Sequence, residues 1–147
     1  MAIIADSGAV YGLYDKTDVT HAAVREAVET ERDKIILPSV ILGELDYLLR
    51  MRMGTRALLQ FLADLASGAF QVETLTAEDL ARCRDLLVKY ENLDLGLCDA
   101  SVIVIADRLR VHRILTVDQR DFRVVRSRDG KPFTLLPADL ARRRPRG

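Results

Sequence analysis

The sequence predicts a single α/β domain built on a parallel sheet, because short apolar segments alternate with longer segments of helical periodicity. Apolar residues make up 49% of the 147 residues, which is enough for a substantial core in a chain of this length. We find no internal repeat and no sign of a second domain, and we expect residues 1–140 to fold as one unit. Residues 141–147 are predicted to form a basic, disordered tail.

The N-terminal half is predicted to contain two strands and four helices. In chain order these are strand 2–5, helix 7–14, helix 18–31, strand 34–37, helix 38–51 and helix 55–66. Pro38 ends the second strand and suits the first turn of the helix that follows it. Gly54 separates the last two helices, and the second of them has an apolar stripe made of Leu58, Phe61, Leu62 and Leu65.

The C-terminal half is predicted to contain three strands, two helices and one turn. They are strand 70–75, helix 76–90, a buried helix entered at residues 95–99 and running to about residue 110, strand 113–117, turn 119–122 and strand 133–137. Thr76 and Asp79 form the pattern of a capping box, with Asp in place of the usual Glu. The helix after them is expected to bury Leu80, Cys83, Leu87 and Tyr90.

Several features indicate a cytoplasmic protein with no membrane association. No apolar run approaches the roughly 18 residues of a membrane span, and Asp6 interrupts the apolar N-terminal stretch that a signal peptide would need. Cys83 and Cys98 are isolated from each other among apolar neighbours, so we expect free thiols in a reducing compartment. With only two histidines, a structural zinc site is not expected.

The net charge is zero, but the charges are segregated along the chain. Residues 1–107 contain 18 acidic and 10 basic residues, whereas residues 108–147 contain 12 basic and 4 acidic residues. A segregated basic segment favours a polyanionic partner, and a solvated surface is the alternative.

Four carboxylates occupy unusual positions. Asp6 and Asp118 directly follow apolar strands, while Glu44 and Asp99 are predicted on apolar helix faces near the helix starts. The carboxyl ends of parallel strands meet at one sheet edge, so these side chains are expected to converge. Like charges in one pocket raise each other's pKa unless a cation is present, and Mg²⁺ or Mn²⁺ prefers such oxygen ligands. The pattern therefore predicts metal-dependent displacement at a phosphoryl group.

Three of these acids also have a simpler interpretation. Asp6 fits a loop residue or a helix cap, Glu44 fits a buried partner for an arginine, and Asp99 fits a first-turn cap. Asp94 and Asp121 fit a loop and a turn, respectively.

The sequence resembles PIN domains, and specifically the VapC-type toxins of bacterial toxin–antitoxin pairs. Four segments carry the resemblance in the order of the family and span nearly the whole chain. They are IADSGA (4–9), PSVILGEL (38–45), LGLCDAS (95–101) and ILTVD (114–118), the last followed by Phe122.

The resemblance implies a three-layer fold with a central, mostly parallel sheet of about five strands, a homodimer, and Mg²⁺-dependent cleavage of RNA. It implies that Asp6 and Asp99 are metal ligands and that Asp118 completes the metal shell, with Asp121 close enough to share this role. Glu44 would bind a second metal or position the attacking water. Two further residues match polar positions that line the pocket, namely Ser7 and Thr116.

The resemblance also implies a cognate antitoxin protein whose C-terminal segment covers the active site. The long apolar stripe of residues 40–62 is our candidate for the wall of its groove, with ordinary core or dimer surface as the alternative.

Other classes fit the residues less well. A receiver domain needs adjacent acids near the N-terminus, and a haloacid-dehalogenase-type phosphatase needs an Asp where Gly8 stands. The alternative to a nuclease is a non-catalytic PIN-like module with an RNA-binding or regulatory role.

Overall fold

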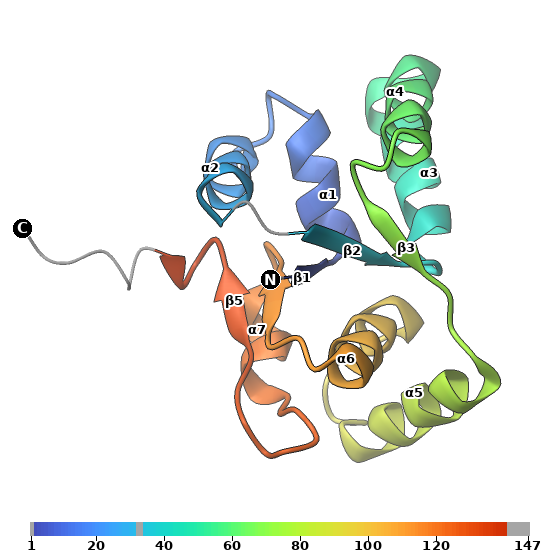
Figure 1. Cartoon of the computed structure of the whole chain (residues 1–147), viewed down its shortest axis with the longest axis vertical. Coiled ribbons are helices and arrows are strands. Elements are labelled where there is room, and N and C mark those ends of the chain that lie inside the picture. Colours follow the sequence, from blue (N-terminus) through green and yellow to red (C-terminus); the bar gives the residue numbers. More distant parts are fainter. Residues whose placement is uncertain (1, 32–33, 141–147) are drawn as a thin grey trace, which may run out of the picture.

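The computed structural model describes residues 2–31 and 34–140, which form one sheet of five parallel strands flanked by helices (Figure 1). The strands are β1 (Ala2–Ala5), β2 (Lys34–Pro38), β3 (Gln71–Glu73), β4 (Arg113–Leu115) and β5 (Thr134–Leu136). Their order in the sheet is β3-β2-β1-β4-β5, and every neighbouring pair is parallel. The predicted α/β class is confirmed.

Seven helices within the described residues cover the two faces of the sheet (Figure 1). They are α1 (Ser7–Tyr14), α2 (His21–Glu31), α3 (Ile41–Met53), α4 (Thr55–Ala66), α5 (Ala77–Lys89), α6 (Leu97–Leu109) and α7 (Gln119–Val124). Helices α1 to α4 lie on one side of the sheet and α5 to α7 on the other, which produces the three layers.

The sheet separates two hydrophobic cores, because successive residues of a strand point to opposite faces. In β1, Ile3 and Ala5 pack into the core beneath α1 to α4, whereas Ile4 packs into the core with α6 and α7. In β2, Ile36 joins the second core and its two neighbours join the first. Burial on both faces explains why these strands are continuous apolar runs.

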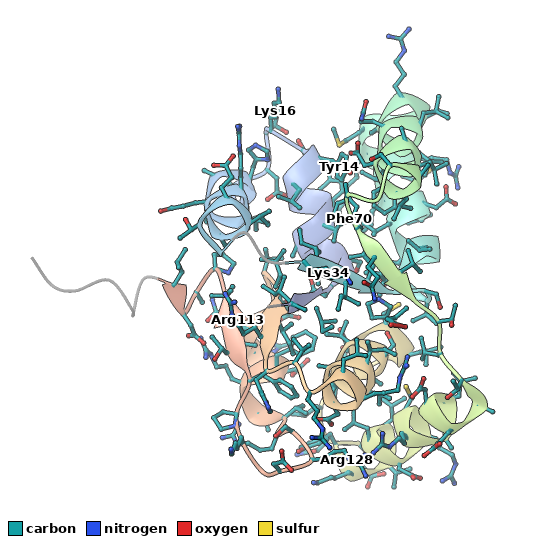
Figure 2. All side chains as sticks on the ribbon, viewed as in Figure 1. Tyr14, Lys16, Lys34, Phe70, Arg113 and Arg128 are labelled. Atoms are coloured by element: carbon teal, nitrogen blue, oxygen red, sulfur yellow. The ribbon has the colours of Figure 1, made fainter. Side chains whose placement is uncertain are left out.

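Aromatic side chains anchor the first core. The ring of Phe61 on α4 meets the ring edge of Tyr14 with centroids 5.6 Å apart, and it lies 5.7 Å from Phe70. The Tyr14 hydroxyl also donates to Asp64 at 2.5 Å, so the end of α1 is tied to α4. Figure 2 shows Tyr14 and Phe70 on this side of the sheet.

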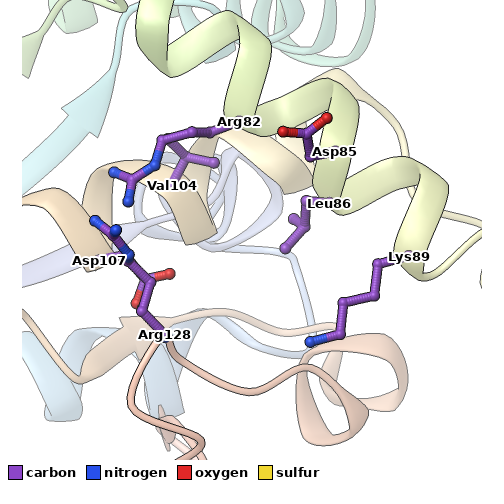
Figure 3. Close-up of a pocket in the computed structure, with 7 residues that line it drawn as sticks. All are labelled: Arg82, Asp85, Leu86, Lys89, Val104, Asp107 and Arg128. Atoms are coloured by element: carbon purple, nitrogen blue, oxygen red, sulfur yellow. The ribbon is translucent and has the colours of Figure 1, made fainter.

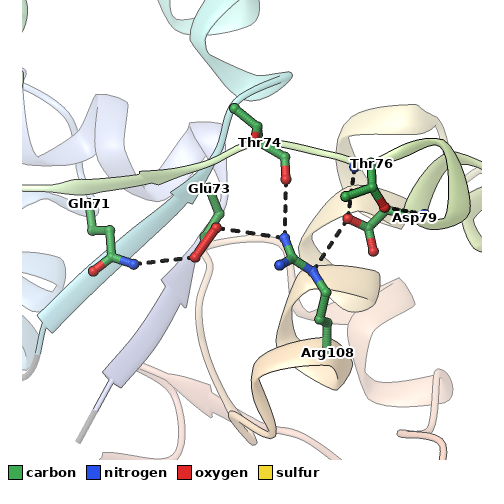
Figure 4. Close-up of polar contacts among 6 residues, drawn as sticks. All are labelled: Gln71, Glu73, Thr74, Thr76, Asp79 and Arg108. Atoms are coloured by element: carbon green, nitrogen blue, oxygen red, sulfur yellow. Dashed lines mark hydrogen bonds and ion pairs between the residues drawn. The ribbon is translucent and has the colours of Figure 1, made fainter.

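A polar network around Arg108 holds the far end of α6 (Figure 4). The Arg108 guanidinium donates to the Thr74 carbonyl at 3.1 Å and lies 3.3 Å from the buried carboxylate of Asp79. Asp79 also accepts the backbone N–H of Thr76, which confirms the predicted capping box. Arg108 therefore connects α6 to the segment between β3 and α5.

Two turns are shaped by local chemistry. Gly54, between α3 and α4, has a φ of 95°, a conformation that side chains with a Cβ rarely adopt. The side chain of Asp18 accepts the backbone N–H of Thr20 at 2.8 Å, and this turn delays the start of α2 to His21.

Several predicted boundaries need correction. The turn predicted at 119–122 is wrong, because these residues begin α7, which is held in place by the buried ring of Phe122. The strands predicted at 70–75, 113–117 and 133–137 are shorter, at three residues each. Leu62 and Leu80 were expected in the core, but they lie at the outer margin of their helical stripes and are exposed.

Within the described residues, no helix is long and apolar enough to cross a membrane. Residues 141–147, the predicted basic tail, lie outside the described part of the chain.

Candidate active site

The topology brings Asp6 and the segment that contains Asp118 to the ends of neighbouring strands. Strand β1 is central, the chain first adds β2 and β3 on one side, and then returns to add β4 and β5 on the other. Ala5 pairs with Leu115, so Asp6 and Thr116 follow side by side at the carboxyl ends of β1 and β4. Such a reversal of strand order is where open α/β sheets bind their ligands.

Asp6 is both a helix cap and a buried acid. One carboxylate oxygen accepts the backbone N–H of Ala9 at 2.9 Å, which caps α1, and the other accepts the hydroxyl of Thr116. Burial, together with the charges of Asp99 and Asp118, raises the pKa of Asp6 to about 6 despite these hydrogen bonds. The capping interpretation is thus correct but incomplete.

Thr116 is a positioning residue of this site. Its buried hydroxyl donates to Asp6, and it accepts the backbone N–H of Asp118 at 3.1 Å. One side chain therefore fixes the Asp6 carboxylate and shapes the turn that carries Asp118.

Asp99 lies in the first turn of α6 and is half-buried. Its carboxylate accepts the backbone N–H of Gly96 at 3.2 Å, as a cap does. Burial raises the pKa of Asp99, and the charges of Asp118, Glu44 and Asp121 raise it further. Asp99 is therefore a cap whose charge is also coupled to three other acids.

The predicted burial of Glu44 is wrong. It was expected on an apolar face of α3, but its side chain is exposed. It still faces the other acids, because its carboxylate accepts the hydroxyl of Ser7 at 2.8 Å. The hydrogen bond from Ser7, rather than burial, thus holds Glu44 at the site.

Asp121 and Cys98 lie closer to the acids than the sequence predicted. Asp121 is buried on α7 and close enough to raise the pKa of Asp99, whereas a turn residue would face solvent. Burial and a hydrogen bond to Glu44 raise the pKa of the Cys98 thiol to about 12, so this thiol stays protonated. The short spacing between Asp118 and Asp121 indicated that Asp121 could lie at the site. Nothing in the sequence indicated this for Cys98. Asp94 is exposed in the loop before α6.

The acidic cluster, defined as Asp6, Glu44, Asp99 and Asp118, fits a hard divalent cation in its chemistry. All its donors are carboxylate oxygens, and the raised pKa values of Asp6 and Asp99 show uncompensated negative charge that a cation would relieve. In the described residues, no three His, Cys, Asp or Glu side chains already stand close enough to form a ligand set. Water molecules or side-chain rotation would have to complete the coordination of an ion.

A cavity lies along the C-terminal half of α6, and none of the four acids lines it (Figure 3). Its volume is about 310 Å³, and Arg82, Lys89 and Arg128 line it around Asp107. Burial raises the pKa of Asp107 to about 6.

Fold and site together define a class, namely three-layer α/β domains with a cluster of acids at the switch point of a parallel sheet. A family model described as PIN domain matches residues 3–127. The chain belongs to the PIN domain family, and within it to the VapC proteins, because it is 34% identical over 135 residues to Ribonuclease VapC26 from Mycobacterium tuberculosis (strain ATCC 25618 / H37Rv). That alignment covers 92% of this chain and 100% of VapC26.

Solved structures support the fold assignment. VapC20 of Mycobacterium tuberculosis, described as a sarcin-ricin loop cleaving toxin, superposes with a TM-score of 0.71 at 21% identity, over 76% of this chain and 86% of VapC20. VapBC2 from Rickettsia felis, solved bound to a DNA fragment from its promoter, gives a TM-score of 0.64 at 14% identity, over 92% and 97% of the two chains. At these identities the likeness concerns the fold.

Proposed function

We propose that this protein is a Mg²⁺- or Mn²⁺-dependent endoribonuclease and the toxin of a toxin–antitoxin pair. The observation that carries the proposal is the buried Asp6, whose pKa is raised by burial and by two further acids at the switch point of the sheet. Identity to a VapC ribonuclease over nearly the whole chain supports RNA as the substrate.

The proposed roles follow from the contacts of each acid. Asp6, Asp99 and Asp118 would hold the cation, with Asp6 oriented by Thr116 and Ala9. When bound, such an ion supplies an activated water and stabilises charge on the phosphate. Glu44, oriented by the Ser7 hydroxyl, would position the attacking water or bind a second ion. Asp121, whose charge acts on Asp99, would assist it.

Surface arginines of the basic segment would hold the RNA backbone. Not all of them are available, because Arg108 and Arg123 pair with acids and Arg113 is buried. Arg110, Arg120 and Arg128 are exposed, and Arg120 remains accessible although it lies 3.9 Å from Asp121. They would contact phosphates without reading sequence.

The partners of this toxin would be a cognate antitoxin and a second copy of the chain. Helices α3 and α4 bury part of the apolar stripe 40–62 and expose five large apolar side chains, namely Tyr47, Met51, Met53, Leu59 and Leu62. This exposed face is our candidate for the groove wall that binds the antitoxin segment. Light scattering at micromolar concentration tests the homodimer, and a monomer alone would contradict it.

The decisive experiment is incubation of purified protein with total cellular RNA, with Mg²⁺ or with EDTA, followed by mapping of new RNA ends. We expect Asp99→Asn to abolish cleavage while the protein stays folded, because Asn keeps the size of the side chain and removes the charge. Asp94→Asn, in the neighbouring exposed loop, is the matched control and should cleave normally.

Near-normal turnover of Asp99→Asn at saturating Mg²⁺ would exclude Asp99 as a metal ligand. RNA binding without any new ends would favour the non-catalytic PIN-like module instead.

A further inference from the structure

A groove beside the acidic cluster is uncharged. It has a volume of about 300 Å³ and lies where the start of α2 meets the segments after β4 and β5. Val19, Ala23, Val117 and Pro137 provide apolar walls, and every described residue that lines the groove is neutral. Its size and lining are those of a small-ligand pocket with few polar groups.

Two residues that line the groove also adjoin the acidic cluster. Thr116 lines it and also donates its hydroxyl to Asp6. Val117 lines it and directly precedes Asp118. A phosphate placed at Asp6 and Asp118 would therefore have the mouth of this groove beside it.

The groove also exposes apolar surface to solvent. Val19 is 98% exposed, and Val117 is 37% exposed. Single exposed apolar residues are common, but these two belong to one hollow that opens beside a charged site. A neutral, flat group would cover them, whereas a phosphate or a charged side chain would gain no partner there.

We propose that this groove binds a nucleobase of the substrate adjacent to the scissile phosphate; this inference rests on the proposed function. A base is joined to its phosphate through one ribose, so a phosphate at the acids places the base within reach. The base face would lie on the apolar walls, and the hydroxyl of Thr20 and the amide of Gln119 would meet its polar edge. Single-stranded RNA is read in this way, through unstacked bases bound on their edges.

The polar edge has defined partners. The Thr20 hydroxyl is held by the carboxylate of Asp18, and the Gln119 carbonyl oxygen accepts from Arg123 at 3.4 Å. An oriented amide can donate and accept at the same time, so Gln119 is the residue best suited to discriminate between bases.

Methyl NMR in EDTA tests the base site without cleavage. The probes are the four ribonucleoside 5′-monophosphates, ribose 5-phosphate, and N-acetyl-leucine amide as a mimic of a peptide side chain. We expect at least one nucleotide to shift the methyl signals of Val19, Ala23 and Val117, and ribose 5-phosphate to leave them unchanged.

Variants make the test specific. Val19→Ser and Gln119→Ala should each weaken binding of that nucleotide about fivefold, the effect of about 1 kcal/mol. Val88→Ser, at another exposed apolar residue on α5, should leave it unchanged.

Three results would overturn the inference. They are groove methyl signals that no nucleotide shifts, equal shifts with ribose 5-phosphate, and a response to N-acetyl-leucine amide alone, which would indicate a peptide site. Cleavage of total RNA is scored separately. A protein that cuts RNA while its groove ignores nucleotides refutes only the base site, and a groove that binds nucleotides in a protein that cuts no RNA refutes only the proposed nuclease.

Discussion

Asp6 is a buried carboxylate, and this makes the apo protein sensitive to pH. Its hydrogen bonds with Ala9 and Thr116 favour the charged form, but burial and two neighbouring acids oppose them and dominate. The charged form of Asp6 therefore lowers the stability of the fold at neutral pH. Active sites commonly contain such residues, because the geometry that serves the reaction is not the geometry that stabilises the fold.

The raised pKa of Asp6 predicts that metal-free protein loses stability as the pH rises from about 4 to about 6. Its folded pKa of about 6 exceeds the ordinary value of 3.8, so the folded state binds the proton more tightly than the unfolded chain. Asp6 thus costs roughly 3 kcal/mol above this window, an order-of-magnitude figure, and nothing below it. Urea unfolding in EDTA at several pH values measures the effect.

Asp6→Asn isolates this contribution, since Asp107 titrates in the same range. The variant should be more stable than wild type at pH 7, and the difference should shrink toward zero near pH 4. A difference that stays constant across this range would show that Asp6 is not the titrating group. Asp46→Asn on the surface of α3 is the control.

A divalent cation should reverse the destabilisation at neutral pH. We expect Mg²⁺ or Mn²⁺ to raise the melting temperature, because the ion binds the folded acidic cluster and not the unfolded chain. Asp6→Asn should remove most of the rise, while Asp46→Asn should keep it. Equal metal-induced shifts in wild type and Asp6→Asn, measured by calorimetry, would mean that Asp6 is not a ligand.

At the scale of elements, α6 carries the site at one end and a structural anchor at the other. Asp99 lies in its first turn, and Arg108 near its last residue contacts Asp79 and the Thr74 carbonyl. This arrangement ties the helix to the segment between β3 and α5 and thereby sets where its first turn meets the acids.

Arg108→Ala should lower the free energy of unfolding by about 2 kcal/mol, because the buried Asp79 loses a charged partner. Urea unfolding at pH 7 measures the change. Arg50→Ala removes an exposed pair with Asp46 on α3 and should cost less than about 0.5 kcal/mol. Equal effects of the two substitutions would contradict an anchoring role for Arg108.

At the scale of the whole molecule, positive charge is segregated from the acidic cluster along the chain. Part of this positive charge is neutralised within the fold, because Arg108 and Arg123 form ion pairs with acids. Four arginines of the tail, at positions 142, 143, 144 and 146, follow the last strand. They lie outside the described residues, and their charge suits contact with a phosphate backbone.

Deleting residues 141–147 should weaken RNA binding in a salt-dependent manner. Each lost phosphate contact makes the log–log salt slope shallower by about 0.7 for single strands. Single-turnover cleavage at saturating enzyme should barely change, because no acid is removed. Salt titrations of full-length and truncated protein measure the slopes, and a tail with its four arginines replaced by glutamine controls for length.

Identical slopes would show that the tail does not contact RNA. A lost single-turnover rate would show that the active site has been misplaced.

The sequence by itself determined the α/β layers, and it supplied the prediction of the four acids. Continuous apolar runs predict doubly buried strands, and β1, β2 and β5 lie where these runs predict them. Asp6 and Asp118 were visible as acids at strand ends, and Thr76 with Asp79 as a capping box. These features are local, because alternation, helical spacing and capping each involve residues a few positions apart.

Only the tertiary structure decided which strand ends became neighbours. The Thr116 hydroxyl reaches Asp6 across 110 positions, and the Ser7 hydroxyl holds an exposed Glu44 that was expected to be buried. The groove beside the acids combines α2 with segments more than 90 residues later, and α7 forms because Phe122 enters a core made mostly by other elements. Periodicity carries no information on such contacts, since the order of strands in the sheet and the packing of helices on it decide them.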